Sequence, residues 1–379
     1  MNRTALIHIV ERLEGLLAKL PGPIQKPVLH ELTPLKELFL QQRAPRLLLA
    51  GAGRLPSPQL VNLLFSGELT QNPPDTLFEV LRWQTLEVKG RGTISVLDAR
   101  GADDEAEEII RVELQRQAAD AILVISDATE GRTKVKRSVE NGNRCVHWND
   151  ACHPGAGIVA VHLNPIHRKN RNGRSEETDW PERIKPELHG RLWGGFEFSA
   201  EHVGAIADRA ASQQFISSLA HKLPNDCRVE IVRISQDPKA QREIASILIK
   251  STTAICTAIG AQPIPLADLP ILTTLQLLLV SGIMYLSGRP RSLRAATEFI
   301  GALGANVGAG MLFREGARAL LKFVPGWGNI VCGMVAGAGT YAIGHAAAAY
   351  FLEGVSIGEA RRTYLKGRRR KKRSTLQLQ

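Results

Sequence analysis

The stretch "RLLLAGAGRLPSPQLVNLLFSG", Arg46 to Gly67, predicts a buried strand, a glycine-containing turn and a helix in immediate succession. The apolar run at 46–51 has the length of a short strand, and residues 58–67 carry apolar side chains at helical spacing. A strand, a glycine turn and a helix together have the outline of a phosphate-binding loop. The same outline is common in ordinary α/β connections, so the segments that follow must decide between the two interpretations.

The segments downstream continue the alternation of strands and helices. We expect strands at 83–90, 91–101, 120–128, 156–164 and 196–200, and helices at 103–118, from 178 towards 193, and up to about 222. Repeated strand–helix units predict a mostly parallel sheet with helices on both faces, and the pair at 83–101 predicts one antiparallel hairpin. The fold class is therefore α/β, with a three-layer, mostly parallel sheet.

Helical sequence flanks this α/β region on both sides. Apolar residues recur at helical spacing over 4–20 and about 27–42, which predicts an N-terminal helical preface over residues 1–45. The α/β region covers 46–225. We place a boundary near 225–238, because beyond it acids become rare and Gly and Ala abundant. An all-α, Gly/Ala-rich domain at 238–356 and a basic tail at 357–379 complete the chain.

The positive charge of the chain belongs to this tail. The sequence has 48 Lys and Arg against 37 Asp and Glu, a formal charge of +11. Nine of the basic residues lie from Arg361 onward, with no acid among them, which leaves +2 for the rest. Such a tail can bind anionic lipid, bind the phosphates of nucleic acid, or remain a solvated extension. It has no interleaved aromatic platform, so a nucleic-acid partner is the less favoured reading.

The five cysteines are scattered and odd in number, which predicts reduced thiols in a cytoplasmic setting. The segment "CVHWNDACH", residues 145–153, mixes Cys and His but lacks the paired spacing of a zinc site. We interpret it as a polar loop with a buried thiol, with a metal site as the alternative. Charges interrupt the apolar residues of 1–20, so no secretory signal is expected.

The loop after the first strand lacks what nucleotide hydrolysis needs. Aligning G-x-x-x-x-G-K-[ST] from Gly51 places Pro56 on the second glycine, Ser57 on the lysine and Pro58 on the hydroxyl residue. The two prolines remove backbone donors, and Ser57 brings no cation. We therefore predict no GTP hydrolysis. Weak nucleotide binding through Gly51, Gly53 and the helix N-terminus stays open.

Three later segments fall where a GTPase has its remaining motifs. They are "LDARG" (97–101), "LNPIH" (163–167) and "FSA" (198–200), and each ends a predicted strand, at the edge where α/β sheets bind ligands. On these motifs, taken in this order after Gly51, residues 46–222 resemble the Era-like, TRAFAC-class P-loop GTPases with degenerate motifs. The resemblance implies a P-loop GTPase-like fold.

The resemblance also assigns roles residue by residue. Asp98 and Gly101 match the D-x-x-G that contacts Mg²⁺ and the γ-phosphate of GTP, while Asn164 matches the first residue of the base motif. Ser199 and Ala200 match the segment that touches the base. Pro165 and His167 replace the Lys and Asp of the base motif, so guanine specificity does not carry over. The alternative for Asp98 is a strand-end residue that caps the next helix.

Residues 240–355 resemble the C-terminal helical domain of unknown function in YcjF-like proteins, on the segments 259–288 and 324–354. That resemblance implies a membrane-associated domain. Residues 269–288 are uncharged over about one membrane span, and Lys322 and Glu353 bracket a longer uncharged run. The pairs Gly304/Gly308 and Gly333/Gly337 permit close helix approach. Basic residues lie on both sides of a hypothetical spanning hairpin, so we favour interfacial insertion; a buried helical hairpin in a soluble bundle is the alternative.

Three hypotheses follow. The first is a catalytically inactive, GTPase-fold scaffold or regulator at the cytoplasmic face of the inner membrane, bound to anionic lipid and to a GTPase paralogue or other protein. The second is an atypical protein that binds GTP and Mg²⁺ weakly. The third is a nucleic-acid-associated protein that uses the basic tail.

Overall fold

A computed structural model describes residues 15, 22–39, 41–52, 55–65, 81–88, 91–127, 131–164, 190–199, 209–261, 269–304 and 327–365. The chain divides into two compact units. One is Arg43–Asp237, and the other joins Met1–Gln42 to Pro238–Gln379. Most of the expected helix at 4–20, the segment 165–189 and the tail beyond 365 lie outside the described residues.

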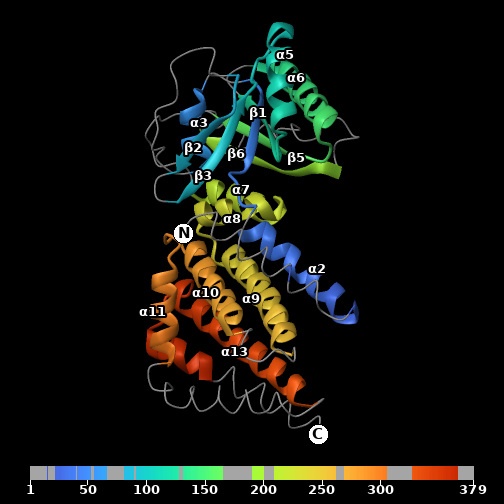
Figure 1. Ribbon diagram of the computed structural model, residues 1–379. Coiled ribbons are helices and arrows are strands. Elements are labelled where there is room, and N and C mark those ends of the chain that lie inside the picture. Colours follow the sequence, from blue (N-terminus) through green and yellow to red (C-terminus); the bar gives the residue numbers. More distant parts are fainter. Residues whose placement is uncertain are drawn as a thin grey trace. The chain divides into compact units, whose positions relative to one another are not determined.

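The first unit contains a six-stranded sheet in the order β2-β3-β1-β4-β5-β6 (Figure 1). Its strands are β1 (Arg46–Gly51), β2 (Gln84–Val88), β3 (Gly92–Asp98), β4 (Ala121–Asp127), β5 (Gly157–Asn164) and β6 (Leu192–Ser199). Neighbouring strands are parallel except β2 and β3, which form an antiparallel hairpin. The structure confirms the α/β class and the mostly parallel sheet. β6 begins at Leu192, where the sequence had predicted helix.

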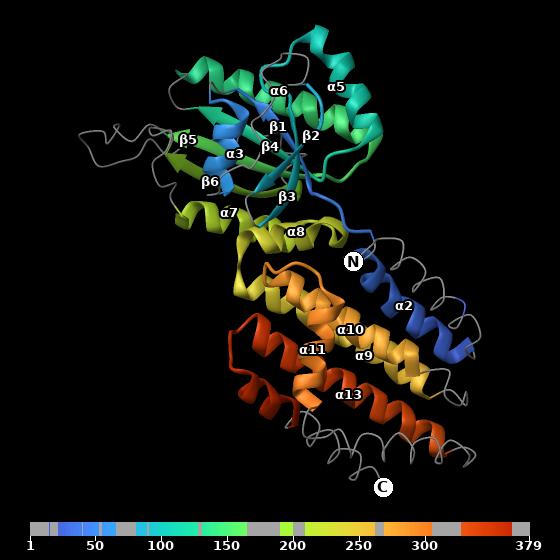
Figure 2. The same cartoon turned by 60° about the vertical axis from the view of Figure 1, so that its left-hand side comes forward.

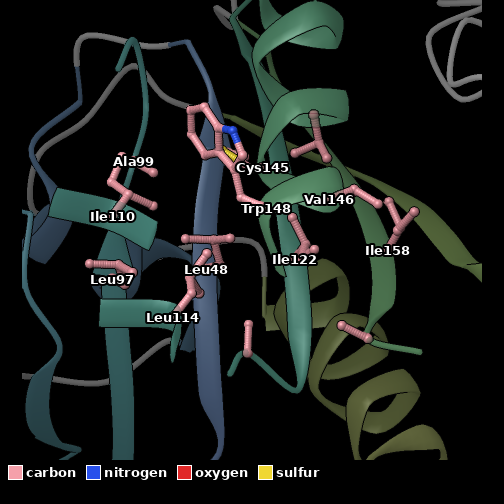
Figure 3. Packing of buried hydrophobic residues seen from close by; sticks show 14 of the residues in the cluster. Leu48, Leu97, Ala99, Ile110, Leu114, Ile122, Cys145, Val146, Trp148 and Ile158 are labelled. Carbon is pink, nitrogen blue, oxygen red and sulfur yellow. The ribbon is translucent and has the colours of Figure 1, made fainter. Parts of the chain in front are cut away.

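Helices lie on both faces of this sheet (Figures 1 and 2). α5 (Asp104–Arg116) and α6 (Gly131–Cys152) pack on one face, where Leu48 and Ile122 meet Leu114 and Trp148 (Figure 3). α3 (Ser57–Phe65), α7 (Arg209–Lys222) and α8 (Asn225–Ser235) pack on the other. There the ring of Phe215 makes edge contacts with three other phenylalanines, at centroid distances of 5.5–6.0 Å, namely Phe65, Phe196 and Phe198.

The segment 145–153 is helical, not the polar loop that the sequence suggested. It forms the last part of α6, whose polar composition hides its period. Cys145 and Trp148 are buried in the core, while His147 is exposed. The thiol and the imidazole therefore lie on different sides of the helix. Among the described residues, no group of His, Cys, Asp and Glu could hold a metal ion.

The boundary expected near 225–238 falls at its far end, because the α/β unit continues through the helix α8 to Asp237. α8 packs against β3, and the carboxylate of Glu230 accepts a hydrogen bond from Thr93 N at 3.2 Å. Gln236 ends the helix in the left-handed conformation, and the second unit resumes at Pro238.

One arginine ties the beginning of the α/β unit to its interior and to α8. Both terminal nitrogens of Arg43 donate to Asp120 at 2.6 Å, and its Nε donates to Asp226 at 2.7 Å. The Asp120 carboxylate, 7% exposed, also accepts from Arg46 N at 2.8 Å. A buried carboxylate is stable only when it is paired in this way.

The described part of the second unit is all α-helical. Its helices are α2 (Gly22–Phe39), α9 (Pro238–Gly260), α10 (Leu269–Leu286), α11 (Leu293–Gly304) and α13 (Trp327–Phe351). α9 contacts α2, α10 and α13, so the N-terminal preface belongs with the C-terminal helices. Residues 357–365, expected as the beginning of the basic tail, form a further helix in which Ala360 and Tyr364 are buried.

Three glycines let α13 approach α9. A Cβ at Gly333 would lie 2.7 Å from Thr257 O, and one at Gly337 would overlap Thr257 Oγ1. A Cβ at Gly344 would lie 2.6 Å from Ile249 Cγ1. The predicted close approach at Gly333 and Gly337 is thus realised within this bundle. Of the other pair, Gly304 is the last residue of α11 and Gly308 lies outside the described part of the chain.

The apolar helices of this unit pack largely against one another. In the described residues, α9 alone is long and apolar enough to cross a membrane, and two thirds of its apolar stretch is buried in the protein. α10 qualifies only as a shorter apolar helix over Ile271–Leu286. This packing is what the buried-bundle alternative predicts for 269–288.

Candidate functional site

The candidate site lies at the carboxyl ends of β1 and β3. β1 stands between β3 and β4, and the connections that follow β1 and β4 leave in opposite directions along the sheet. Open α/β sheets bind ligands at such a point. Here the turn after β3 is fastened to β1, because Ala99 N donates to Leu49 O at 2.8 Å and Gly101 N donates to Gly51 O at 2.9 Å.

The backbone conformation and the close packing at position 51 both require glycine. Its φ is +95°, and a Cβ would overlap the carbonyl oxygen of Ile125 on β4. Its amide donates to the side-chain oxygen of Asn141 at 2.7 Å, and the amide nitrogen of Asn141 donates to Ala102 O at 3.4 Å. Asn141, 8% exposed, therefore holds the turns after β1 and β3 against α6.

Ser57, Asp98 and Arg100 form one hydrogen-bonded network. The hydroxyl of Ser57, the first residue of α3, donates to Asp98 Oδ2. Arg100 donates to Asp98 Oδ1 from its backbone N at 3.1 Å and from Nε at 2.9 Å, and to Oδ2 from a terminal nitrogen at 2.8 Å. The other terminal nitrogen of Arg100 donates to Leu55 O at 2.8 Å. The guanidinium thus joins the loop after β1 to the turn after β3.

This network fills the hydrogen-bonding capacity of Asp98. A carboxylate has about four acceptor positions, and Asp98 receives four donors, three of them from Arg100. The side chains of Asp98 and Arg100 are 11% and 7% exposed. An arginine stays charged at any ordinary pH, so the carboxylate is permanently neutralised. The residues present do not fit a Mg²⁺ ion, because the carboxylate has no free oxygen position and a cation already stands beside it.

The structure places two of the residues singled out in the sequence. Ser57, aligned from the sequence with the P-loop lysine, is the first residue of α3, and its hydroxyl donates to Asp98. Asp98 does not cap the next helix, because Asp103 caps α5 by accepting from Ala106 N at 3.0 Å. Pro56 and Pro58 bracket the start of α3 and supply no backbone donors.

The residues assigned to base recognition lie farther along the sheet. Asn164 and Ser199 are partners in the β5–β6 register, so their backbones are adjacent at the carboxyl ends of these strands. β5 is two strands from β1, about 10 Å at the usual strand spacing. Gly53, Ala200, Pro165 and His167 lie outside the described residues.

A cleft of about 860 Å³ opens on the α6 side of the two turns. We call it the α6 cleft. Its floor is made by small residues of both turns, and its wall is one face of α6. The lining residues are Gly51, Ala52, Gly101, Ala102, Arg137, Glu140, Asn141, Asn143, Arg144, His147 and Trp148.

Sequence reasoning missed Arg100 and the whole α6 wall. Arg100 lies inside the D-x-x-G segment, where the motif leaves its identity open, so only the folded turn shows that it reaches back to Asp98. The wall had a detectable signal, since Arg137, Asn141, Arg144 and Trp148 recur at three- and four-residue spacing.

No family model matches the chain. Over 134 residues the chain is 31% identical to a protein named magnetosome membrane protein 22 from Magnetospirillum gryphiswaldense. The match covers 32% of this chain and 67% of that protein. The name describes that relative as a protein of the magnetosome membrane.

Proposed function

The chain belongs to the same family as magnetosome membrane protein 22, and from this premise we propose that it is a membrane-associated scaffold or regulator with a catalytically inactive, GTPase-like unit. In this proposal the α/β unit binds a protein partner, such as an intact GTPase paralogue. The helical unit and the basic tail hold the chain at the cytoplasmic face of the inner membrane. The name of the relative supports the membrane part of the proposal.

The proposal that the GTPase-like unit is catalytically inactive rests on Asp98, whose carboxylate already accepts four hydrogen bonds. GTP hydrolysis relies on Mg²⁺ and on positioned positive charge beside the phosphates. The guanidinium of Arg100 is instead paired with Asp98 and also donates to Leu55 O. It therefore bridges the two loops that would have to bind the phosphates of a nucleotide. The prolines beside Ser57 remove further donors from the first loop.

Isothermal titration with GTP tests this reading. We expect no binding at micromolar GTP, with Mg²⁺ or with EDTA. Micromolar binding that requires Mg²⁺ would refute the proposal, because it would mean that the ion pair between Arg100 and Asp98 breaks and that Asp98 binds the metal. Micromolar binding of either kind would favour the atypical GTP-binding protein of the second hypothesis, and binding that EDTA leaves unchanged would mean that the nucleotide is held without the metal.

Liposome flotation tests the membrane part. The truncation should follow Leu365, because Ala360 and Tyr364 are buried and an earlier cut would disturb the helical unit. The removed segment, 366–379, holds seven basic residues and no acid. At about 1 kcal/mol for each basic residue near an anionic surface, its loss should abolish binding.

We expect the full chain to float with anionic vesicles but not with neutral ones, and the truncated chain to stay in solution. If the truncated chain floats equally well, the tail is not the anchor. If the full chain never floats but shifts a DNA or RNA fragment in a gel, the nucleic-acid hypothesis replaces the membrane proposal.

A further inference from the structure

We propose that the α6 cleft is a binding site for a small organic anion with an aromatic ring. The proposal concerns a different face of the turns from the Ser57–Asp98–Arg100 network. It stands or falls independently of the GTPase-like reading, because it uses only the residues that line the cleft.

The size and floor of the cleft suit a small molecule. Its volume of about 860 Å³ lies within the usual range of ligand pockets. The floor has no long side chains, because the two turns contribute only Gly and Ala there. The floor is also held in place, since Asn141 bonds to Gly51 N and to Ala102 O. A ligand would therefore meet a preformed surface.

Arg144 and Trp148 form a flat wall. The guanidinium carbon of Arg144 lies 5.2 Å from the centroid of the Trp148 ring, which is within the range of a cation–π contact. Arg144 also donates to Asp104 at 2.6 Å and lies 3.7 Å from Glu107. These acids lie beside the guanidinium and offset part of its charge. The side chain remains 39% exposed, which leaves guanidinium surface on which an aromatic ring can stack.

Arg137 supplies the charge that selects an anion. Its side chain is exposed, and within the described residues it makes no hydrogen bond or ion pair. His147 is likewise exposed and without a partner in that part of the chain. Glu140, an acid that also lines the cleft, already interacts with another group. The guanidinium of Arg137 is therefore available for a carboxylate, sulfonate or phosphate.

The guanidinium of Arg137 and the wall formed by Arg144 and Trp148 together define the class of ligand. Arg137 and His147 are ten residues apart, about 15 Å along the helix, so a single inorganic ion cannot reach both ends of the wall. An organic anion can place its acidic group at Arg137 and its ring beside Arg144. Among the described residues that line the cleft, the backbone of the two turns has no free N–H donors for an anion. The four amides there already donate within the fold, namely those of Gly51, Ala52, Gly101 and Ala102.

The test uses 1-anilinonaphthalene-8-sulfonate, an aromatic sulfonate, with the full-length protein. Binding is followed by energy transfer from tryptophan to the probe. We expect one saturable site, which Arg137→Gln weakens about fivefold or more. Arg82→Gln is the matched control, because Arg82 is also exposed, lies outside the cleft and has no partner among the described residues. Ala52→Leu should fill the floor and remove the saturable signal.

Thermal unfolding of each variant shows that it is folded. The proposal is overturned if the probe does not saturate a site, if Arg137→Gln and Arg82→Gln bind it equally, or if Ala52→Leu keeps the saturable signal. Displacement of the probe by an equal concentration of inorganic phosphate would also overturn it, because phosphate has no ring.

Discussion

Substituting Gly337 by alanine should destabilise the helical unit, although alanine is the better helix former. In an exposed helix interior, Gly to Ala gains about 1 kcal/mol. At Gly337 the new methyl group would overlap Thr257 Oγ1 and lie 3.3 Å from Thr257 Cβ. Thr257 cannot turn aside freely, because its hydroxyl donates to Thr253 O at 2.7 Å.

The magnitude follows from these opposing terms. Overpacking of a well-packed contact costs about 1–3 kcal/mol, and loss of the Thr257 hydrogen bond adds about 1 kcal/mol. After the gain in helix propensity, Gly337→Ala should lower the free energy of unfolding by about 1–3 kcal/mol. Gly339, two residues away on the same helix, has no atom within 4 Å of a built Cβ. Gly339→Ala should therefore raise the stability by about 1 kcal/mol.

Urea unfolding followed by far-ultraviolet circular dichroism measures both variants, since more of the described helical residues belong to the helical unit than to the α/β unit. The double variant Gly337→Ala with Thr257→Ala should recover about 1 kcal/mol relative to the sum of the single changes, because the clashing hydroxyl is gone. Equal stabilisation by Gly337→Ala and Gly339→Ala would refute the reasoning, since it would mean that α13 does not rest on α9 at Gly337.

Three further outcomes are expected in the α/β unit. Asp120→Asn should lower its free energy of unfolding by about 2 kcal/mol in urea denaturation, less than for a fully buried pair because Arg43 is 27% exposed. Gly51→Ala should cost about 3 kcal/mol or more, seen as loss of soluble folded protein, because φ is +95° and the methyl group meets the Ile125 carbonyl. Burial raises the pKa of the Cys145 thiol to about 12, so the native thiol should not react with a disulfide reagent at pH 8. Since the folded pKa is the higher one, stability gained from this thiol is present below pH ~9 and falls as the pH rises towards 12.

Much of the sheet was predictable because its strands are buried on both faces. Runs such as 46–51 and 120–128 are almost wholly apolar, and buried parallel strands read in this way. α6 escaped prediction for the opposite reason. Most of its residues are polar, and its few core residues, such as Cys145 and Trp148, stand among His and Asp that resemble metal ligands.

The candidate site was predictable only as a location. Gly51 and Asp98 could be found from their places at strand ends. The partner of Asp98 could not, because Arg100 reaches it through the conformation of a turn rather than through a regular spacing.

The α/β unit is inserted between α2 and the helices on which α2 packs, and this order matters during synthesis. α2 leaves the ribosome early, with Leu32, Leu35 and Leu38 on the side that it later buries. Its first partner, α9, follows after roughly 200 residues, which take about 10–40 s to translate. The α/β unit has all its residues by then and can fold first, whereas the apolar stripe of α2 stays uncovered until α9 has been made.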